Sequence, residues 1–194
     1  MKQTIRILFS VLCLVAGFAA VQANPLPGLY VHVNPADGMQ GVILSPGHPT
    51  PLTESILHLS VRNESNQPIA HAPVVVSFAP GIVPCPDAQL ETVTDENGEA
   101  EVTLAGGGCL SAIDGACSIR VNGIEVRAYR NAKSPDWDGI GSDRRVSSGD
   151  FIGFARAFNQ PAPGGCYDFD NSGLVGGADF AIFARAFNAG SHCP

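Results

Sequence analysis

Residues 118–128 read SIRVNGIEVRA, two short alternating segments on either side of Asn122-Gly123. An Asn-Gly pair favours the two-residue turn that joins neighbouring antiparallel strands. Apolar and polar residues alternate in the same way in three stretches upstream, whose apolar positions are Leu57, Leu59 and Val61, then Val74, Val76 and Phe78, then Ala100, Val102 and Leu104. A side-chain period of two is typical of strands with one buried face. The fold class that we expect is therefore mainly β.

Turn residues separate these segments at short intervals. Asp95-Glu96-Asn97-Gly98 lies between residues 89–93 and 99–104, and Pro80-Gly81 supplies another break. About seven short strands within roughly 100 residues are typical of a sandwich of two antiparallel sheets. We expect Gly106-Gly107-Gly108 to form a loop that ends a strand.

Two runs in this region carry a family resemblance. Residues 66–76 read NQPIAHAPVVV and residues 94–104 read TDENGEAEVTL. Both resemble bacterial Ig-like domains of the invasin and intimin kind, in which the first run crosses a tight turn and the second opens a hairpin. The resemblance implies an Ig-like β-sandwich over residues 24–130. It implies no particular function, because sandwiches host many unrelated ones.

The first residues indicate the compartment. Lys2 and Arg6 precede an apolar run over residues 7–15, and small residues lead to Val21-Gln22-Ala23. This is the pattern of a secretory signal peptide over residues 1–23. The apolar run is shorter than the ~18–20 residues that cross a bilayer, so we expect no membrane insertion. We expect the protein to be secreted or held at the cell surface.

Cleavage after Ala23 would leave five cysteines. An exported protein favours disulfides, and five is an odd number. A loop followed by a helix returns its ends to the same side, so we predict a bridge between Cys166 and Cys193. That bridge would leave one further bridge and one spare among Cys85, Cys109 and Cys117. The alternative is that Cys193 pairs with another molecule.

Charge and motifs exclude several function classes. The net charge of −7 disfavours nucleic acid and anionic membranes as partners. The chain has no nucleophile elbow, metalloprotease helix motif or phosphate-binding glycine loop. Its five histidines are isolated from one another in the sequence. We therefore expect a protein that is not an enzyme.

The C-terminal part is duplicated at a period of 29 residues. Residues 150–159 read DFIGFARAFN and residues 179–188 read DFAIFARAFN. In each copy the phenylalanines lie three and four positions apart, the spacing of one helix face. We predict two short amphipathic helices that share one aromatic core, preceded by a linker at residues 131–135.

A candidate metal loop precedes the second helix. Residues 168–179 read DFDNSGLVGGAD, with Gly173 at the sharp turn. Calcium takes six to eight oxygen ligands from alternate residues of such a loop and from the helix that follows. The ligands that we predict are the side chains of Asp168, Asp170, Ser172 and Asp179 and the carbonyl of Leu174. The alternative is an acidic turn in which Asp179 only complements the helix dipole.

The first copy departs from this pattern. Asp143 and Asp150 align with the second loop, but Arg144 replaces the turn glycine. Asp136 and Asp138 can serve as further ligands only if residues 140–142 are an insertion. Calcium binding and a metal-free structural copy both remain open for this loop.

The duplicated region, over about residues 136–188, resembles a type I dockerin, a module of two EF-hand-like calcium loops and helices. The resemblance implies Ca²⁺ as cofactor and a cohesin-like domain or cell-surface scaffold as partner, often in polysaccharide degradation. The partner-contact positions of that family fall on small residues here, namely Ser148, Gly149, Gly177 and Ala178.

The function that we expect is a secreted, non-catalytic, calcium-binding interaction protein. We also expect calcium to supply folding energy to residues 131–194, because two short helices bury little without it. The alternative is a carbohydrate-binding or adhesin-like accessory protein that uses the sandwich. A glycan surface needs exposed aromatic side chains, and the sandwich offers Tyr30, Phe78 and Tyr129.

Overall fold

The computed structural model describes residues 28–34, 40–161 and 165–194. The described part of the chain is mainly β, as expected, with three sheets followed by two helices. The predicted signal peptide lies outside the described residues. Among those residues, no helix has the length and apolar character needed to cross a membrane. We call residues 28–133 the β unit and residues 134–194 the tail.

Two antiparallel sheets of the β unit share one hydrophobic core. The first sheet has the order β1–β3–β7, with bounds Tyr30–Asn34, Ile56–Arg62 and Glu99–Thr103. The second has the order β10–β9–β4–β6, with bounds Ile124–Tyr129, Cys117–Val121, Pro73–Phe78 and Glu91–Val93. Leu59, Val74 and Ile119 are fully buried between them. The alternating segments thus form strands, and their apolar positions line the core.

The Asn122-Gly123 hairpin is confirmed. Asn122 and Gly123 have φ angles of 51° and 78°, the left-handed conformation that a two-residue hairpin turn needs. The turn joins β9 to β10 and sets the pairing of Val121 with Ile124.

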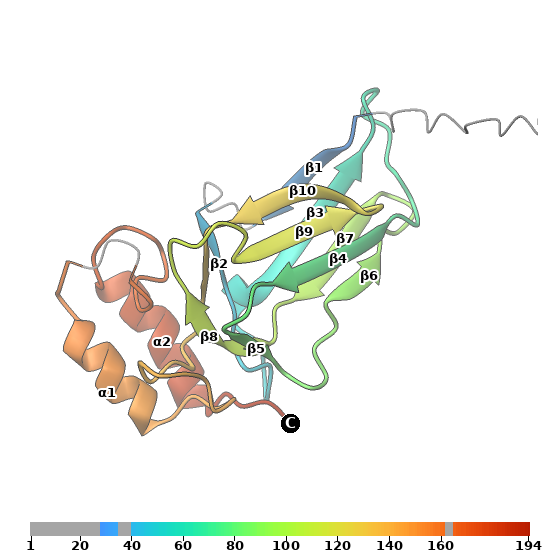
Figure 1. Ribbon diagram of the computed structural model, residues 1–194. Coiled ribbons are helices and arrows are strands. Elements are labelled where there is room, and N and C mark those ends of the chain that lie inside the picture. The colour runs from blue at the N-terminus through green and yellow to red at the C-terminus, as the bar shows by residue number, and fades with distance from the viewer. Residues whose placement is uncertain (1–27, 35–39, 162–164) are drawn as a thin grey trace, which may run out of the picture.

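A third sheet of the β unit, of order β2–β11–β8–β5, lies on the side of the tail (Figure 1). Its strands are Gly41–Ile43, Asn131–Lys133, Gly106–Leu110 and Ile82–Pro84. A short 3-10 helix, η1 (Thr53–Ser55), precedes β3. The start of the predicted linker, Asn131–Lys133, is in fact a buried strand that pairs with β2 and β8.

The prediction that residues 106–108 form a loop is wrong, because these glycines begin β8. Their lack of side chains lets neighbouring segments pack against the strand. A Cβ atom on Gly107 would lie 1.9 Å from Asp136 Oδ2, and one on Gly108 would lie 2.5 Å from the carbonyl of Gly81. This close packing requires glycine. Because a run of glycines has no alternation of apolar and polar residues, the sequence pattern does not reveal the strand.

The two predicted helices are present as α1 (Ser148–Ala157) and α2 (Gly177–Ala189). They lie together beside one end of the β unit, as the orange and red ribbons of Figure 1 show. The rings of Phe154 and Phe183 stack with centroids 4.9 Å apart and are buried, which confirms the shared aromatic core. Leu52 of the β unit belongs to the same cluster, so the tail packs onto the sheets.

The predicted Cys166–Cys193 bridge is wrong. The disulfides are Cys85–Cys193 and Cys109–Cys166, and Cys117 is part of neither. The prediction treated the tail as a separate unit that closes on itself. In the structure the tail lies against the β unit, so each of its cysteines meets a cysteine of the β unit. Both bridges therefore fasten the tail to the β unit.

Candidate metal centre

The loop that precedes α2 is curled by its own carboxylates. Asp168 accepts hydrogen bonds from the backbone N–H groups of Ser172 and Gly173, at 2.9 and 3.0 Å. Asp170 Oδ1 accepts a second bond from the Ser172 N–H, at 3.0 Å. Gly173 has a φ of 86°, a left-handed conformation that glycine adopts without steric cost. The sequence therefore folds this segment into the tight turn that an oxygen-ligand loop requires.

Asp179 closes the loop from the first turn of α2. Its Oδ1 accepts hydrogen bonds from the N–H groups of Phe169 and Asp170, at 2.6 and 3.2 Å. Its Oδ2 accepts one from the N–H of Gly176, at 2.8 Å. These bonds draw the beginning of the loop to the beginning of the helix. Asp179 therefore also caps the first turn of α2.

Three carboxylates meet at this point. Asp168, Asp170 and Asp179 each place one oxygen within 4.8 Å of the other two. Within residues 28–34, 40–161 and 165–194, this is the one such group of at least three His, Cys, Asp or Glu side chains. Burial raises the pKa of Asp168, which reflects the cost of an ionised group out of water. A cation among the three would lower that cost.

Two further oxygens of the predicted set lie in the same loop. The Ser172 hydroxyl donates a hydrogen bond of 3.1 Å to the carbonyl of Leu174. All five predicted donors of this loop are oxygens, the ligands that calcium and magnesium prefer. The residues present therefore fit a hard divalent cation.

The first copy has the same turn but not the same cluster. Arg144 adopts a φ of 68°, so it occupies the turn that Gly173 forms in the second copy. Asp143 Oδ1 accepts from the Arg145 N–H at 3.0 Å. Asp138 Oδ1 accepts from the N–H groups at positions 140 and 141, at 2.8 and 3.0 Å. These carboxylates hold turns together, and they form no group of three comparable to the second loop.

Asp136 is buried against the β unit. Its Oδ2 accepts a hydrogen bond of 2.5 Å from the Ser142 hydroxyl, and its Oδ1 is buried without a hydrogen bond. Burial raises the pKa of Asp136 to about 6, and the negative charges of Asp150 and Asp143 act in the same direction. Asp150 forms a capping box with Ser147 at the start of α1, and burial raises its pKa also.

Sequence reasoning missed two residues that support the second loop. The Lys133 ammonium, buried in β11, donates to the carbonyl of Asp168 and, at 2.7 Å, to Asn171 Oδ1. Asn131 Nδ2 donates to the same Asn171 oxygen at 3.1 Å. The sequence shows only a lysine and an asparagine just after the end of the predicted β domain, which indicates no contact with the loop. Nothing in their spacing links them to a loop that begins 35 residues after Lys133.

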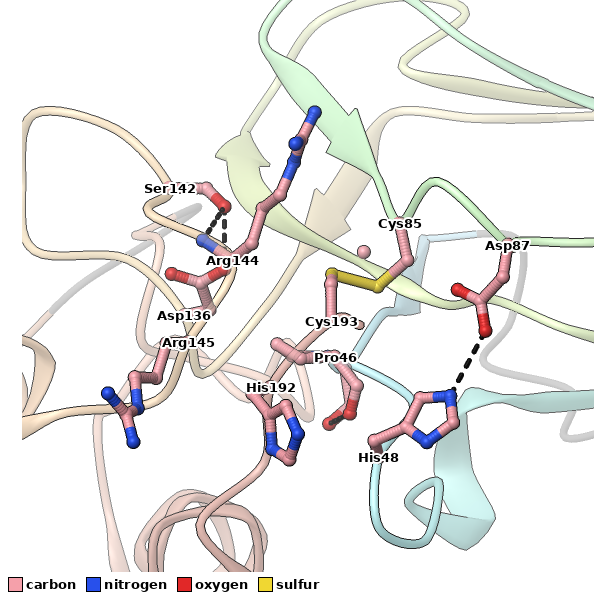
Figure 2. Close-up of a disulfide and its surroundings, with 12 residues drawn as sticks. Pro46, His48, Cys85, Asp87, Asp136, Ser142, Arg144, Arg145, His192 and Cys193 are labelled. Carbon is pink, nitrogen blue, oxygen red and sulfur yellow. Dashed lines mark hydrogen bonds and ion pairs between the residues drawn. A yellow bond between two sulfur atoms is a disulfide. The ribbon is translucent and has the colours of Figure 1, made fainter.

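The C-terminal segment is fastened to the β unit near Cys85. Figure 2 shows the Cys85–Cys193 disulfide between the side of His48 and Asp87 and the side of Asp136 and Ser142. His48 Nε2 lies 3.0 Å from Asp87 Oδ2. The backbone of His192 exchanges hydrogen bonds with the backbone of His48, at 2.9 and 3.0 Å. The end of the tail is thus held by both covalent and hydrogen bonds.

The outer side of the helix pair is apolar and partly exposed. Its exposed large side chains are Phe151, Ile152, Phe158, Phe180 and Phe187. A cleft of about 310 Å³ between the helices is lined by Phe151, Phe154, Ala155, Phe158 and Phe180. A contiguous exposed apolar surface of this kind is typical of a contact site for another molecule.

The aromatic side chains considered for glycan binding are mostly covered. Tyr129 is 2% exposed and Phe78 is half-buried, whereas Tyr30 is 63% exposed. A single exposed tyrosine gives little stacking surface for a sugar. No family model and no curated protein sequence matches the chain.

Proposed function

We propose that the protein is a secreted, non-catalytic, calcium-binding interaction protein whose tail docks onto a cohesin-like domain or a surface scaffold. The observation that carries this proposal is the meeting of Asp168, Asp170 and Asp179 in one curled loop. The carbonyl of Leu174 and the hydroxyl of Ser172 would complete the oxygen set. A bound calcium ion would neutralise part of the charge of the three carboxylates.

The duplicated tail supports a docking role of the type I dockerin kind. The four small residues at the family's contact positions, Ser148, Gly149, Gly177 and Ala178, are all exposed to solvent. The apolar cleft between α1 and α2 adds a hydrophobic surface beside them. The proposed partner is a cohesin-like domain of a polysaccharide-degrading system.

The β unit supports an Ig-like assignment through its two facing antiparallel sheets of three and four strands. In this proposal it presents or spaces the tail. Two disulfides support an exported protein, because such bonds persist in oxidising compartments. We assign calcium to the second loop only, because the first copy forms no comparable group of carboxylates.

The calcium assignment is tested by calorimetric titration of the full mature chain. The wild type should give one calcium-binding event, and the double substitution Asp168→Ala and Asp179→Ala should abolish it. Asp95→Ala, an exposed turn carboxylate of the β unit, is the matched control and should retain the event. Binding that survives the double substitution would show that the ligands are wrong.

The docking assignment is tested with a purified cohesin domain. Binding is measured by surface plasmon resonance in calcium and in chelator, for the wild type and for the double variant. We expect calcium-dependent binding that the double variant loses. Equal binding with and without calcium, or no binding to any member of a cohesin panel, would contradict the docking role.

A further inference from the structure

The lysine beneath the second loop is unusual in both sequence and structure. Lys133 is the only lysine after Lys2 in the whole chain. Its side chain is 1% exposed, and buried lysines are rare unless their charge is compensated. Both of its hydrogen-bond acceptors identified above, the Asp168 carbonyl and Asn171 Oδ1, belong to the candidate metal loop. The positive charge is therefore fixed next to a carboxylate ligand residue.

The strand beneath the loop is held rigidly in place. Lys133 pairs in register with Cys109 of β8, and Cys109 is bonded to Cys166, two residues before the loop. Asn131 adds hydrogen bonds to Asn171 and to the carbonyl of Gln40. The ammonium cannot swing away from the loop unless these attachments break. Salt also screens its charge much less than that of an exposed lysine.

We propose that Lys133 is an internal counter-ion that sets the affinity of the second loop for cations. The inference rests on the calcium assignment made above. Lys133 supplies a positive charge that partly balances the three carboxylates when no metal is bound. The same charge repels a metal ion at the carboxylates, and by Coulomb's law the repulsion grows with the charge of the ion. The loop is thereby kept curled without metal and binds calcium more weakly than its ligand set alone would.

The test compares two substitutions that remove the charge. Lys133→Gln retains an amide donor toward the loop, whereas Lys133→Met retains only the length of the side chain. Arg120→Gln, in β9 on an exposed position, is the control that changes net charge equally without touching the loop. Circular dichroism and non-reducing peptide mapping establish that each variant folds with both disulfides. Calcium and terbium(III) affinities are then measured by calorimetry on the full mature chains.

We expect both Lys133 variants to bind calcium at least about fivefold more tightly than the wild type, and the control to stay within about twofold. The gain for terbium(III), which resembles calcium in size but carries three charges, should be larger than the gain for calcium. A purely structural role of Lys133 would not produce this dependence on ion charge. Lys133→Gln alone suffices for the comparison if Lys133→Met does not fold.

Three results would overturn the inference. If the wild type binds calcium and the Lys133 variants bind it equally or more weakly, this inference is overturned and the calcium assignment stands. Equal gains for calcium and terbium(III) would show that the effect is not electrostatic. Absence of calcium binding by the wild type and all variants would overturn both this inference and the calcium assignment.

Discussion

Gly173 and Arg144 occupy equivalent turns of the two repeats, and both have left-handed φ angles. Glycine adopts this conformation freely, whereas a residue with a side chain pays roughly 1–2 kcal/mol. In the first copy that cost is offset by hydrogen bonds from the backbone to Ser142 and Asp143. The polar side chains of both loops hold their turns by hydrogen bonds, and in the second loop three carboxylates also converge on one point.

Gly107 allows Asp136 to pack against β8. A Cβ atom there would lie 1.9 Å from Asp136 Oδ2 and 2.2 Å from the Ser142 hydroxyl. We therefore predict that Gly107→Ala lowers the free energy of unfolding by about 2–3 kcal/mol, the upper part of the range for overpacking in a close-packed site. Urea denaturation with the disulfides intact measures this change.

Gly141→Ala is the matched control for that substitution. Gly141 lies in the adjoining loop, its φ is not left-handed, and a Cβ would meet nothing within 4 Å. The control should change the free energy of unfolding by less than about 0.5 kcal/mol. Equal effects of the two substitutions would contradict the packing of the tail against β8.

Asp136 should make stability depend on pH. Its pKa in the folded protein is about 6, above the value of 3.8 for an exposed aspartate, so the folded state holds the proton more tightly than the unfolded chain. Protonation therefore stabilises the fold as the pH falls from 7 through 6 toward 4, by up to about 3 kcal/mol from this group. In Asp136→Asn that gain should be absent, because the amide does not titrate.

The measurement is the free energy of urea unfolding in chelator at pH 7 and pH 5, for the wild type and for Asp136→Asn. Other carboxylates titrate in both proteins, so the quantity of interest is the difference between the two pH profiles. Superimposable profiles would show that Asp136 is ionised in the folded protein like an exposed carboxylate.

At the scale of the elements, the phenylalanines of the helix pair differ in their exposure to solvent. Phe183 is 1% exposed and stacks on Phe154, whereas Phe180 is 46% exposed. We predict that Phe183→Ala lowers the free energy of unfolding by about 3–5 kcal/mol, as for other buried phenylalanines. Phe180→Ala should cost less than about 1.5 kcal/mol, because roughly half of its ring is already in water.

The same pair of variants separates folding from docking. If the apolar cleft contacts the partner, Phe180→Ala should weaken binding to the purified cohesin domain. The circular dichroism spectrum of this variant should stay that of the wild type. Equal losses of stability in the two variants would contradict the orientation of α2 described here.

The elements that could be predicted from the sequence are those with a repeating side-chain pattern. Alternation located β3, β4 and β7, the Asn-Gly pair located the β9–β10 hairpin, and the phenylalanine spacing located both helices. β8 begins with three glycines and β11 is only three residues long, so neither has a pattern to detect. For the metal loop, the spacing of its carboxylates predicted that they cluster. It did not predict the hydrogen bonds that Lys133 donates to the loop.

At the scale of the whole molecule, the tail is fastened more strongly than the sequence predicts. In the chain-entropy model, disulfides that span 57 and 108 residues each contribute about 4–5 kcal/mol. Calcium at a hundredfold excess over its dissociation constant contributes only about 2.7 kcal/mol. Because each disulfide contributes more than calcium does, calcium is not expected to be the main source of folding energy for the tail.

We therefore predict that the full chain keeps its helical circular dichroism signal in chelator while both disulfides are intact. After reduction, the helical signal should become dependent on calcium. Loss of helix in chelator before reduction would restore the expectation drawn from the sequence, that the tail needs metal to fold.

The pairing of the disulfides could not be foreseen because it depends on how the two halves of the molecule meet. Cysteine spacing indicates which loops could close, but not which surfaces pack together. The packing of Leu52 against the helix cluster and the ion pair of Glu54 with Arg185 join residues far apart in sequence. Contacts of this kind leave no local pattern.

The two cross-links also bear on the response of the chain to proteolysis. Ile140, between Gly139 and Gly141, is 90% exposed and is the most accessible large apolar residue of the described chain. A protease that cuts there would divide the chain into one piece with Cys85 and Cys109 and another with Cys166 and Cys193. Because each piece holds one half of both disulfides, the nicked protein should migrate as one species on a non-reducing gel and as two after reduction. A tail joined only by its peptide chain would be lost at the first cut, whereas this one stays attached to the β unit by both disulfides.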